Sequence, residues 1–187
     1  GWWFSQSGIE YQYDYPKANQ ITPEQKEYIK NYMDEFERIM GSENFANPTS
    51  GYPSFIDIDS FADHFIINEV ARNIDAYRIS AYLYKDRDSK DPRLHAGPLW
   101  DFNLSFGLAF FDMDFFLTEG WVVDYNLTHR SDAFQVPFWW EKLSDDKAFM
   151  TRIADRWTEL RRSVLHKDNL YARIDATADT LAEAKVR

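Results

Sequence analysis

The chain has 187 residues, of which 44% are hydrophobic and 18% aromatic, so it is too rich in large apolar side chains to be disordered and long enough for one folded domain. Its formal net charge is -10 and it has no run rich in lysine or arginine, which argues against nucleic acid as a partner. It has no cysteine, which excludes disulfides, thiolate zinc sites and cysteine nucleophiles.

The first predicted helix begins at Pro23, a residue that suits the first helical position. Thr22 can cap it, Gln25 completes a capping box, and Gly41 ends it. Apolar residues recur at spacings of three and four over residues 29–40, which predicts one buried face. This pattern is typical of a packing helix and not of a site.

A second helix is predicted with Asp59 as its N-cap and an end near Asn73. Its apolar residues again recur at helical spacing. The predicted buried stripe consists of Phe61, Phe65, Ile66, Val70 and Ile74.

A β-hairpin is predicted next, because residues 78–84 alternate between polar and apolar side chains and a charged turn separates them from residues 94–100. Beyond Phe102 we expect an aromatic loop region with irregular spacing.

Residues 136–140 are predicted to lead into short helical stretches. Asp145 or Asp146 can cap a further helix that runs through Val164, and another is expected from about Asp168 to the end. The expected fold is therefore α+β and mostly helical, with a small central hairpin. No stretch approaches the roughly 18 uninterrupted apolar residues of a membrane helix, so we expect a chain that is not transmembrane.

Two aspartates flank the predicted hairpin, Asp75 after the second helix and Asp101 after the second strand. A hairpin returns the chain to its origin, so both carboxylates can lie on the same side. Phosphoryl transfer uses one carboxylate near the attacking hydroxyl and another that binds magnesium, to which an amide oxygen such as that of Asn103 can contribute. Aspartate at the end of a helix or strand is also common as a cap, and this alternative stays open for each residue.

Four ordered blocks of the chain form a distinctive set: FIDIDSFADHFIINE at 55–69, NID at 73–75, YLYKD at 82–86 and GPLWDFNLSFG at 97–107. Together they resemble the C-terminal half of the CotH kinase family of spore-coat proteins. The flanking residues 15–17, with the helix that follows them, and 136–140 also resemble Bacteroidetes-type members of that family.

The resemblance implies the C-terminal-lobe-like part of a divergent protein-kinase-like fold. Such an atypical kinase transfers the γ-phosphoryl group of ATP, with Mg²⁺, to serine or threonine of surface or coat proteins, outside the cell or at its surface. By this resemblance, Asp75 matches the essential aspartate of the block that begins with Asn73, and Asp101 matches the metal-binding aspartate.

The lysine-bearing, glycine-rich nucleotide lobe of such kinases is not found in residues 1–187, and both ends look cut, so we expect a partial domain in which that upstream lobe is missing. The phosphates of ATP are normally cradled by that lobe. The chain alone is therefore expected to be inactive.

Two positions depart from the family pattern. The family often has a metal-binding asparagine where this chain has Ser80, and a second acid where it has Asn103. A hydroxyl is a poorer magnesium ligand than an amide oxygen, and Asn103 keeps an oxygen but loses a charge. A pseudokinase is therefore an alternative to the active enzyme.

The remaining candidates stay open. Asn68 and Glu69 on the second helix can orient Asp75 or the substrate, or can form a buried structural hydrogen bond. Tryptophans that could stack on sugars suggest an extracellular glycan-binding or structural module, with carbohydrate as the partner, although such residues can also be core. A glycosidase, which also uses two carboxylates, ranks last. The tryptophans are Trp2, Trp3, Trp121, Trp139 and Trp140.

Overall fold

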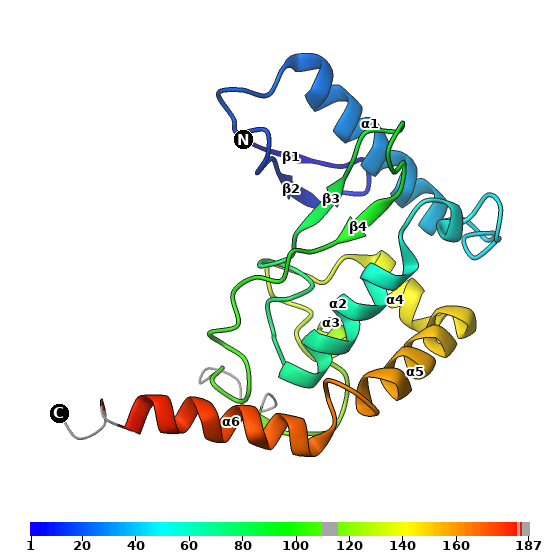
Figure 1. The fold of residues 1–187 in the computed structure, drawn as a ribbon. Coiled ribbons are helices and arrows are strands. Elements are labelled where there is room, and N and C mark those ends of the chain that lie inside the picture. The colour runs from blue at the N-terminus through cyan, green and yellow to red at the C-terminus, as the bar shows by residue number, and fades with distance from the viewer. Residues whose placement is uncertain (110–115, 183, 185–187) are drawn as a thin grey trace.

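The computed structural model describes residues 1–109, 116–182 and 184, and in this part the chain is mostly helical with two small antiparallel hairpins (Figure 1). This agrees with the predicted mixed and mostly helical fold. The strands are β1 Trp2–Phe4, β2 Glu10–Gln12, β3 Leu83–Lys85 and β4 Leu94–Ala96. The helices are α1 Pro23–Met40, α2 Ile58–Ala71, α3 Tyr125–Thr128, α4 Phe138–Asp145, α5 Lys147–Arg161 and α6 Lys167–Ala182, with short 3-10 helices η1 Tyr52–Ser54 and η3 Val122–Asp124.

Helix α1 begins and ends where the sequence predicts. The Thr22 hydroxyl accepts from the Gln25 backbone N–H, and the Gln25 side chain accepts from the Thr22 N–H at 2.9 Å, which completes the capping box. Gly41 follows the last helical residue, and the last two turns bury most of the predicted apolar stripe.

The hairpin of β1 and β2 was not predicted. Its strands pair Trp3 with Tyr11, and their rings lie 5.1 Å apart between centroids. The Tyr11 hydroxyl donates to Glu37 Oε1 of α1 at 2.7 Å, and this contact explains why Glu37 is buried. Burial and the Glu37 charge raise the pKa of Tyr11 well above its ordinary value, so the hydroxyl stays a donor.

Helix α2 begins one residue before the expected cap, so the prediction of Asp59 as N-cap is wrong. Asp57 has extended backbone, and its side chain accepts from the Ser60 N–H at 2.9 Å, which makes it the cap. Asp59 instead lies in the first turn and pairs with Arg152 of α5. Val70 of the predicted stripe is 41% exposed, because the apolar face turns away from it near the end of the helix.

The core lies between α2, α4 and α5. Phe61 of α2 packs on both tryptophans of α4, with 6.2 Å to the Trp139 ring and 5.4 Å to the Trp140 ring. Tyr77, from the turn after α2, meets Trp140 edge-on at 4.9 Å. Helix α5 begins after Asp146, which caps it as predicted and accepts from the Tyr52 hydroxyl at 2.6 Å.

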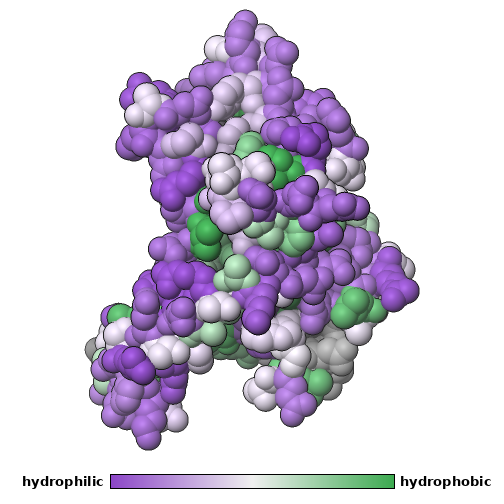
Figure 2. All heavy atoms as spheres, turned by 90° about the vertical axis from the view of Figure 1, so that its right-hand side faces the viewer, coloured by the Kyte–Doolittle hydropathy of each residue, from purple (hydrophilic) through white to green (hydrophobic). Residues whose placement is uncertain are grey.

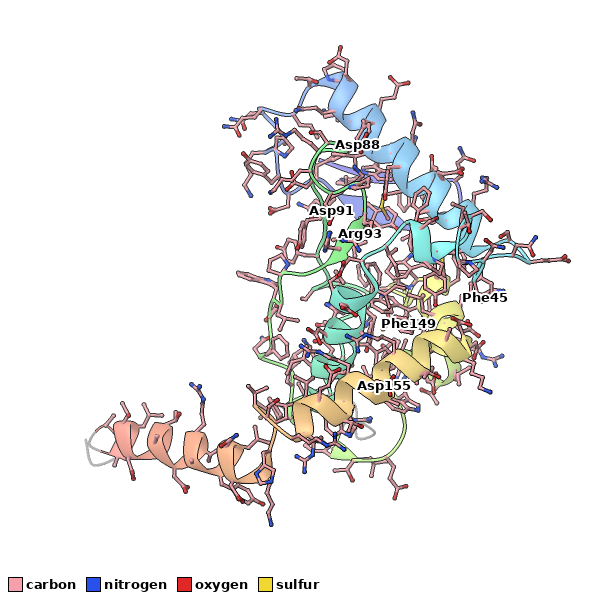
Figure 3. All side chains as sticks on the ribbon, turned by 45° about the vertical axis from the view of Figure 1, so that its right-hand side comes forward. Phe45, Asp88, Asp91, Arg93, Phe149 and Asp155 are labelled. Atoms are coloured by element: carbon pink, nitrogen blue, oxygen red, sulfur yellow. The ribbon has the colours of Figure 1, made fainter. Side chains whose placement is uncertain are left out.

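The central hairpin of β3 and β4 is present but shorter than predicted. On its first side, the backbone N–H groups of residues 78–80 all donate to the Asp75 carbonyl oxygen and so form a turn instead of a strand. On its second side, Gly97 has a φ of 126°, and Pro98 has no N–H to continue the ladder. Asp91 and Arg93 lie beside each other before β4 (Figure 3) and form an ion pair at 2.9 Å.

Helix α6 extends from one end of the molecule and has no buried residue (Figure 1). It follows the predicted last helix as far as Ala182, while residues 183 and 185–187 of that prediction, and residues 110–115 of the predicted aromatic loop, lie outside the described residues. One face of the molecule is mostly hydrophilic, with hydrophobic residues in small separate patches (Figure 2). Within the described ranges, no helix combines the length and the apolar character that crossing a membrane requires.

Candidate functional site

A tight turn after α2 positions Asp75. Arg72 closes the helix in the left-handed region, with a φ of 52°, and the Asn73 N–H returns to the Asn68 carbonyl at 3.0 Å. The Asp75 carbonyl then accepts the three N–H groups of residues 78–80, at 3.0 to 3.2 Å. The backbone around Asp75 is therefore held from both sides, which fixes where its side chain begins.

Asp101 follows the central hairpin and approaches the same turn. Its φ of 59° is left-handed, a conformation that aspartate tolerates better than most residues. The Ser80 hydroxyl donates to Asp101 Oδ2 at 3.4 Å, and Asn73 Nδ2 lies 3.4 Å from the Asp101 carbonyl oxygen. Residues of the turn that carries Asp75 thus contact Asp101 by both its side chain and its backbone.

The carboxylates of Asp75 and Asp101 are here called the acidic pair, and the charge of Asp101 affects Asp75. Burial raises the pKa of Asp75 above its ordinary value, Arg78 lowers it, and the negative charges of Asp101 and Asp132 raise it. The Asp75 side chain is 17% exposed, whereas Asp101 is exposed. A bound cation would offset the repulsion between such like charges.

The residues present fit a magnesium ion, which binds through one or two carboxylates and keeps several waters. Asp101 offers exposed carboxylate oxygens, and Ser80 adds a hydroxyl beside them. Asn103 is exposed in the turn that follows Asp101. Across the part of the chain that the structure describes, no three histidine, aspartate or glutamate side chains gather to hold a metal, so such an ion would depend on waters and phosphates for its other ligands.

The carboxylate of Glu69 is surrounded by hydrogen-bond donors of the fold. Its two carboxylate oxygens accept the backbone N–H groups of Val122 and Val123 at 2.7 and 2.9 Å and the Tyr77 hydroxyl at 2.9 Å. Burial raises the pKa of Glu69, and these hydrogen bonds oppose that rise. Glu69 therefore anchors η3 to α2, and the structure gives it no contact with Asp75.

Asn68 contributes to the site through Asn73. Its side chain donates to the His64 carbonyl at 2.8 Å, and its own oxygen lies 3.3 Å from Asn73 Nδ2. Both asparagines are buried, so they connect the last turns of α2 to the Asp101 backbone. This is a supporting role. It matches the interpretation of Asn68 as a residue that forms buried structural hydrogen bonds.

Two residues of the site were missed from sequence. Arg78 donates from Nη2 to Asp75 Oδ1 at 3.0 Å and from Nη1 to Asp132 Oδ2 at 3.2 Å. The spacing of three residues between Asp75 and Arg78 is a signal that could have been used. Asp132 comes from a distant part of the chain and gives no such signal.

A groove of about 560 Å³ lies elsewhere, between α2, α5 and the chain that follows β4. His64, Pro98, Leu99 and Leu160 are among its lining residues, and neither member of the acidic pair is.

The tryptophans do not form one surface row. Trp139 and Trp140 are buried in the core, while Trp2 and Trp121 are exposed on separate elements. For Trp139 and Trp140 this supports the interpretation as core residues instead of a sugar platform.

Comparison with known proteins gives one family. The family model described as CotH kinase protein matches residues 2–187. No curated protein and no solved structure matches the chain.

Proposed function

This chain belongs to the CotH kinase family, and we propose that it contributes the acidic half of a site that transfers a phosphoryl group from ATP, with Mg²⁺, to serine or threonine of a surface or coat protein. Family membership supports kinase-like phosphotransfer. The donor, the metal and the protein substrate are our proposal.

One observation carries the assignment of roles. Asp75 and Asp101, which follow different elements, are brought together by a single turn, and the charge of one raises the pKa of the other. Phosphoryl transfer uses two carboxylates placed in this way, one for the attacking hydroxyl and one for the metal. Their arrangement therefore fits the C-terminal-lobe-like part of a divergent kinase.

We assign the hydroxyl-binding role to Asp75. Arg78 binds only its Oδ1, and among the described residues none hydrogen-bonds Oδ2, which can accept the proton of a serine or threonine hydroxyl. Asp101, assisted by Ser80 and Asn103, would hold magnesium. When bound, that ion neutralises negative charge on the phosphates.

The test is Asp101→Asn in the complete natural protein. We expect magnesium-dependent ATP turnover to fall by at least about 100-fold, because the remaining amide cannot supply the charge that the metal requires. The melting temperature should change little, since asparagine also tolerates the left-handed backbone.

The matched control is Asp155→Asn, an exposed aspartate on α5 (Figure 3). It removes the same charge and should leave turnover unchanged. If Asp101→Asn lowers the melting temperature sharply while turnover stays intact, Asp101 is a structural turn residue and the proposal fails.

A pseudokinase is the second candidate, and Ser80 and Asn103 favour it. The Ser80 hydroxyl donates a long hydrogen bond of 3.4 Å to Asp101, and Asn103 carries no charge. Binding of ATP with magnesium by the complete protein, without any turnover, would support this candidate over the active enzyme.

A further inference from the structure

Arg78 is almost completely enclosed by acceptors. Its side chain is 4% exposed, and Nη2 binds Asp75 Oδ1 at 3.0 Å while Nη1 binds Asp132 Oδ2 at 3.2 Å. Nη1 also donates to the Phe134 carbonyl at 3.0 Å, and Nε donates to the Ile74 carbonyl at 3.2 Å. Each of its three nitrogens therefore has at least one partner, so the plane of the guanidinium is fixed.

The aromatic ring of Tyr125 covers the same guanidinium. The central carbon of Arg78 lies 4.3 Å from the centroid of that ring, a distance at which a cation is attracted to the ring face. The Tyr125 hydroxyl donates to Asp132 Oδ2, and Asp132 Oδ1 accepts the Phe134 N–H at 2.8 Å. Residues 125–134 are thus linked to one another and together hold Arg78, and they are called the brace below.

This arrangement has a direct effect on Asp75. Arg78 donates to Oδ1 and has no hydrogen bond to Oδ2, so it restrains the carboxylate through one of its two oxygens. A reacting group must be held within about 0.5 Å of its productive position. The ion pair is largely buried, so solvent screens it less than a surface pair.

We propose that Arg78 is a positioning residue for phosphoryl transfer, which orients Asp75 through Oδ1 and is itself held by the brace of residues 125–134. The inference rests on the function proposed above. Arg78 is not a catalytic residue, because it acts through Asp75.

A lysine cannot replace Arg78 in this role. Lysine retains the charge but has only one nitrogen. Arg78 uses three nitrogens in one plane to contact the Ile74 carbonyl, the Asp75 carboxylate and the brace. Charge and orientation can therefore be separated by a single substitution.

The first experiment compares Arg78→Lys with Arg156→Lys in the complete natural protein. Arg156 is a suitable control because it also pairs with an aspartate, donating from two nitrogens to Asp63 at 2.7 and 3.0 Å, but it has no hydrogen bond to Asp75 or Asp101. We expect Arg78→Lys to lower kcat about 100-fold with KM for ATP and acceptor unchanged, since a small misplacement of a reacting group costs about this much. Arg156→Lys should leave both constants unchanged. A kcat within twofold of the parent for Arg78→Lys would overturn the proposal.

The second experiment does not depend on activity. Nuclear magnetic resonance of ¹⁵N-labelled arginine side chains should show separate, slowly exchanging Nη signals for Arg78, and Asp132→Asn should average them by loosening the brace. Averaged signals in the parent protein would show that Arg78 is not held and would overturn the inference. If the parent protein shows separate Nη signals for Arg78 but no ATP turnover, the proposed function fails. The structural contact between Arg78 and Asp75 would still stand in that case.

Discussion

Two acidic side chains, Glu69 near the end of α2 and Asp75 in the turn that follows it, have opposite surroundings. Glu69 has both oxygens filled by two backbone N–H groups and a tyrosine hydroxyl. Asp75 has one oxygen held by Arg78, and the charge of Asp101 raises its pKa. The pKa of each is raised by burial, so the pKa alone does not distinguish them.

What distinguishes them is how their hydrogen-bonding capacity is used. A buried carboxylate filled by backbone donors fixes the fold, because any change leaves those donors unpaired. A carboxylate with an oxygen left over, beside a like charge, is available to a substrate or metal. Asp75→Asn and Glu69→Gln each remove one negative charge. We therefore expect the first to affect turnover and the second to affect stability.

The largest effect is expected for Asp75→Asn in the complete natural protein. Asparagine keeps an oxygen for Arg78 but cannot accept the proton of the attacking hydroxyl, so kcat should fall about 1000-fold. The urea midpoint should stay close to that of the parent protein. If Asp75→Asn keeps the parental turnover but lowers the stability, Asp75 is a structural residue like Glu69. The contrast between the two residues would then be wrong.

Glu69→Gln should show the reverse pattern. The amide nitrogen of glutamine is a donor and would face a backbone N–H of Val122 or Val123, which leaves that group unpaired. We expect a loss of about 3 kcal/mol in the free energy of unfolding, measured in urea, with kcat per folded molecule unchanged. Glu27→Gln on α1, an exposed position, is the control and should change neither quantity.

Much of this framework could be predicted from local sequence signals. Thr22 and Gln25 define the start of α1, and Asp146 defines the start of α5, because a capping side chain acts on a backbone N–H two or three residues away. The position of Asp75 and Asp101 on either side of a hairpin was also readable from the order of elements.

What was missed depends on tertiary contacts. The β1–β2 hairpin is stabilised by Tyr11 on Glu37, and the role of Glu69 depends on Val122, neither of which has a sequence signature. The spacing of Arg78 from Asp75 was a local signal that was not used, whereas its second partner, Asp132, is brought close only by the fold. Local patterns thus located the acidic pair but could not show what holds it.

The smallest predicted effect concerns His64, which lies on α2 together with Glu69. Its Nε2 lies 3.1 Å from the Ala76 carbonyl, and burial lowers its pKa to about 4. As the pH falls below about 6.5, His64 of the unfolded chain takes up a proton while the folded residue stays neutral, so stability is lost until the pH approaches the folded pKa. Between pH 7 and pH 5 this loss should be about 2 kcal/mol.

His64→Gln keeps a donor for Ala76 and should remove that part of the pH dependence, as measured by urea unfolding at both pH values. The raised pKa of Glu69 acts in the opposite direction but is common to both proteins and cancels in the difference. His166→Gln, at an exposed histidine, serves as control and should keep the parental slope. An unchanged slope in His64→Gln would show that His64 is protonated equally in both states.

The left-handed backbone at Asp101 has an evolutionary consequence. Glycine and asparagine accept this conformation as readily as aspartate, and each is one base change away from an aspartate codon. A lineage could therefore lose the proposed metal ligand in a single step while keeping the backbone conformation of the turn. By the function proposed above, the residue found at this position in a descendant would then indicate whether that descendant still uses the reaction.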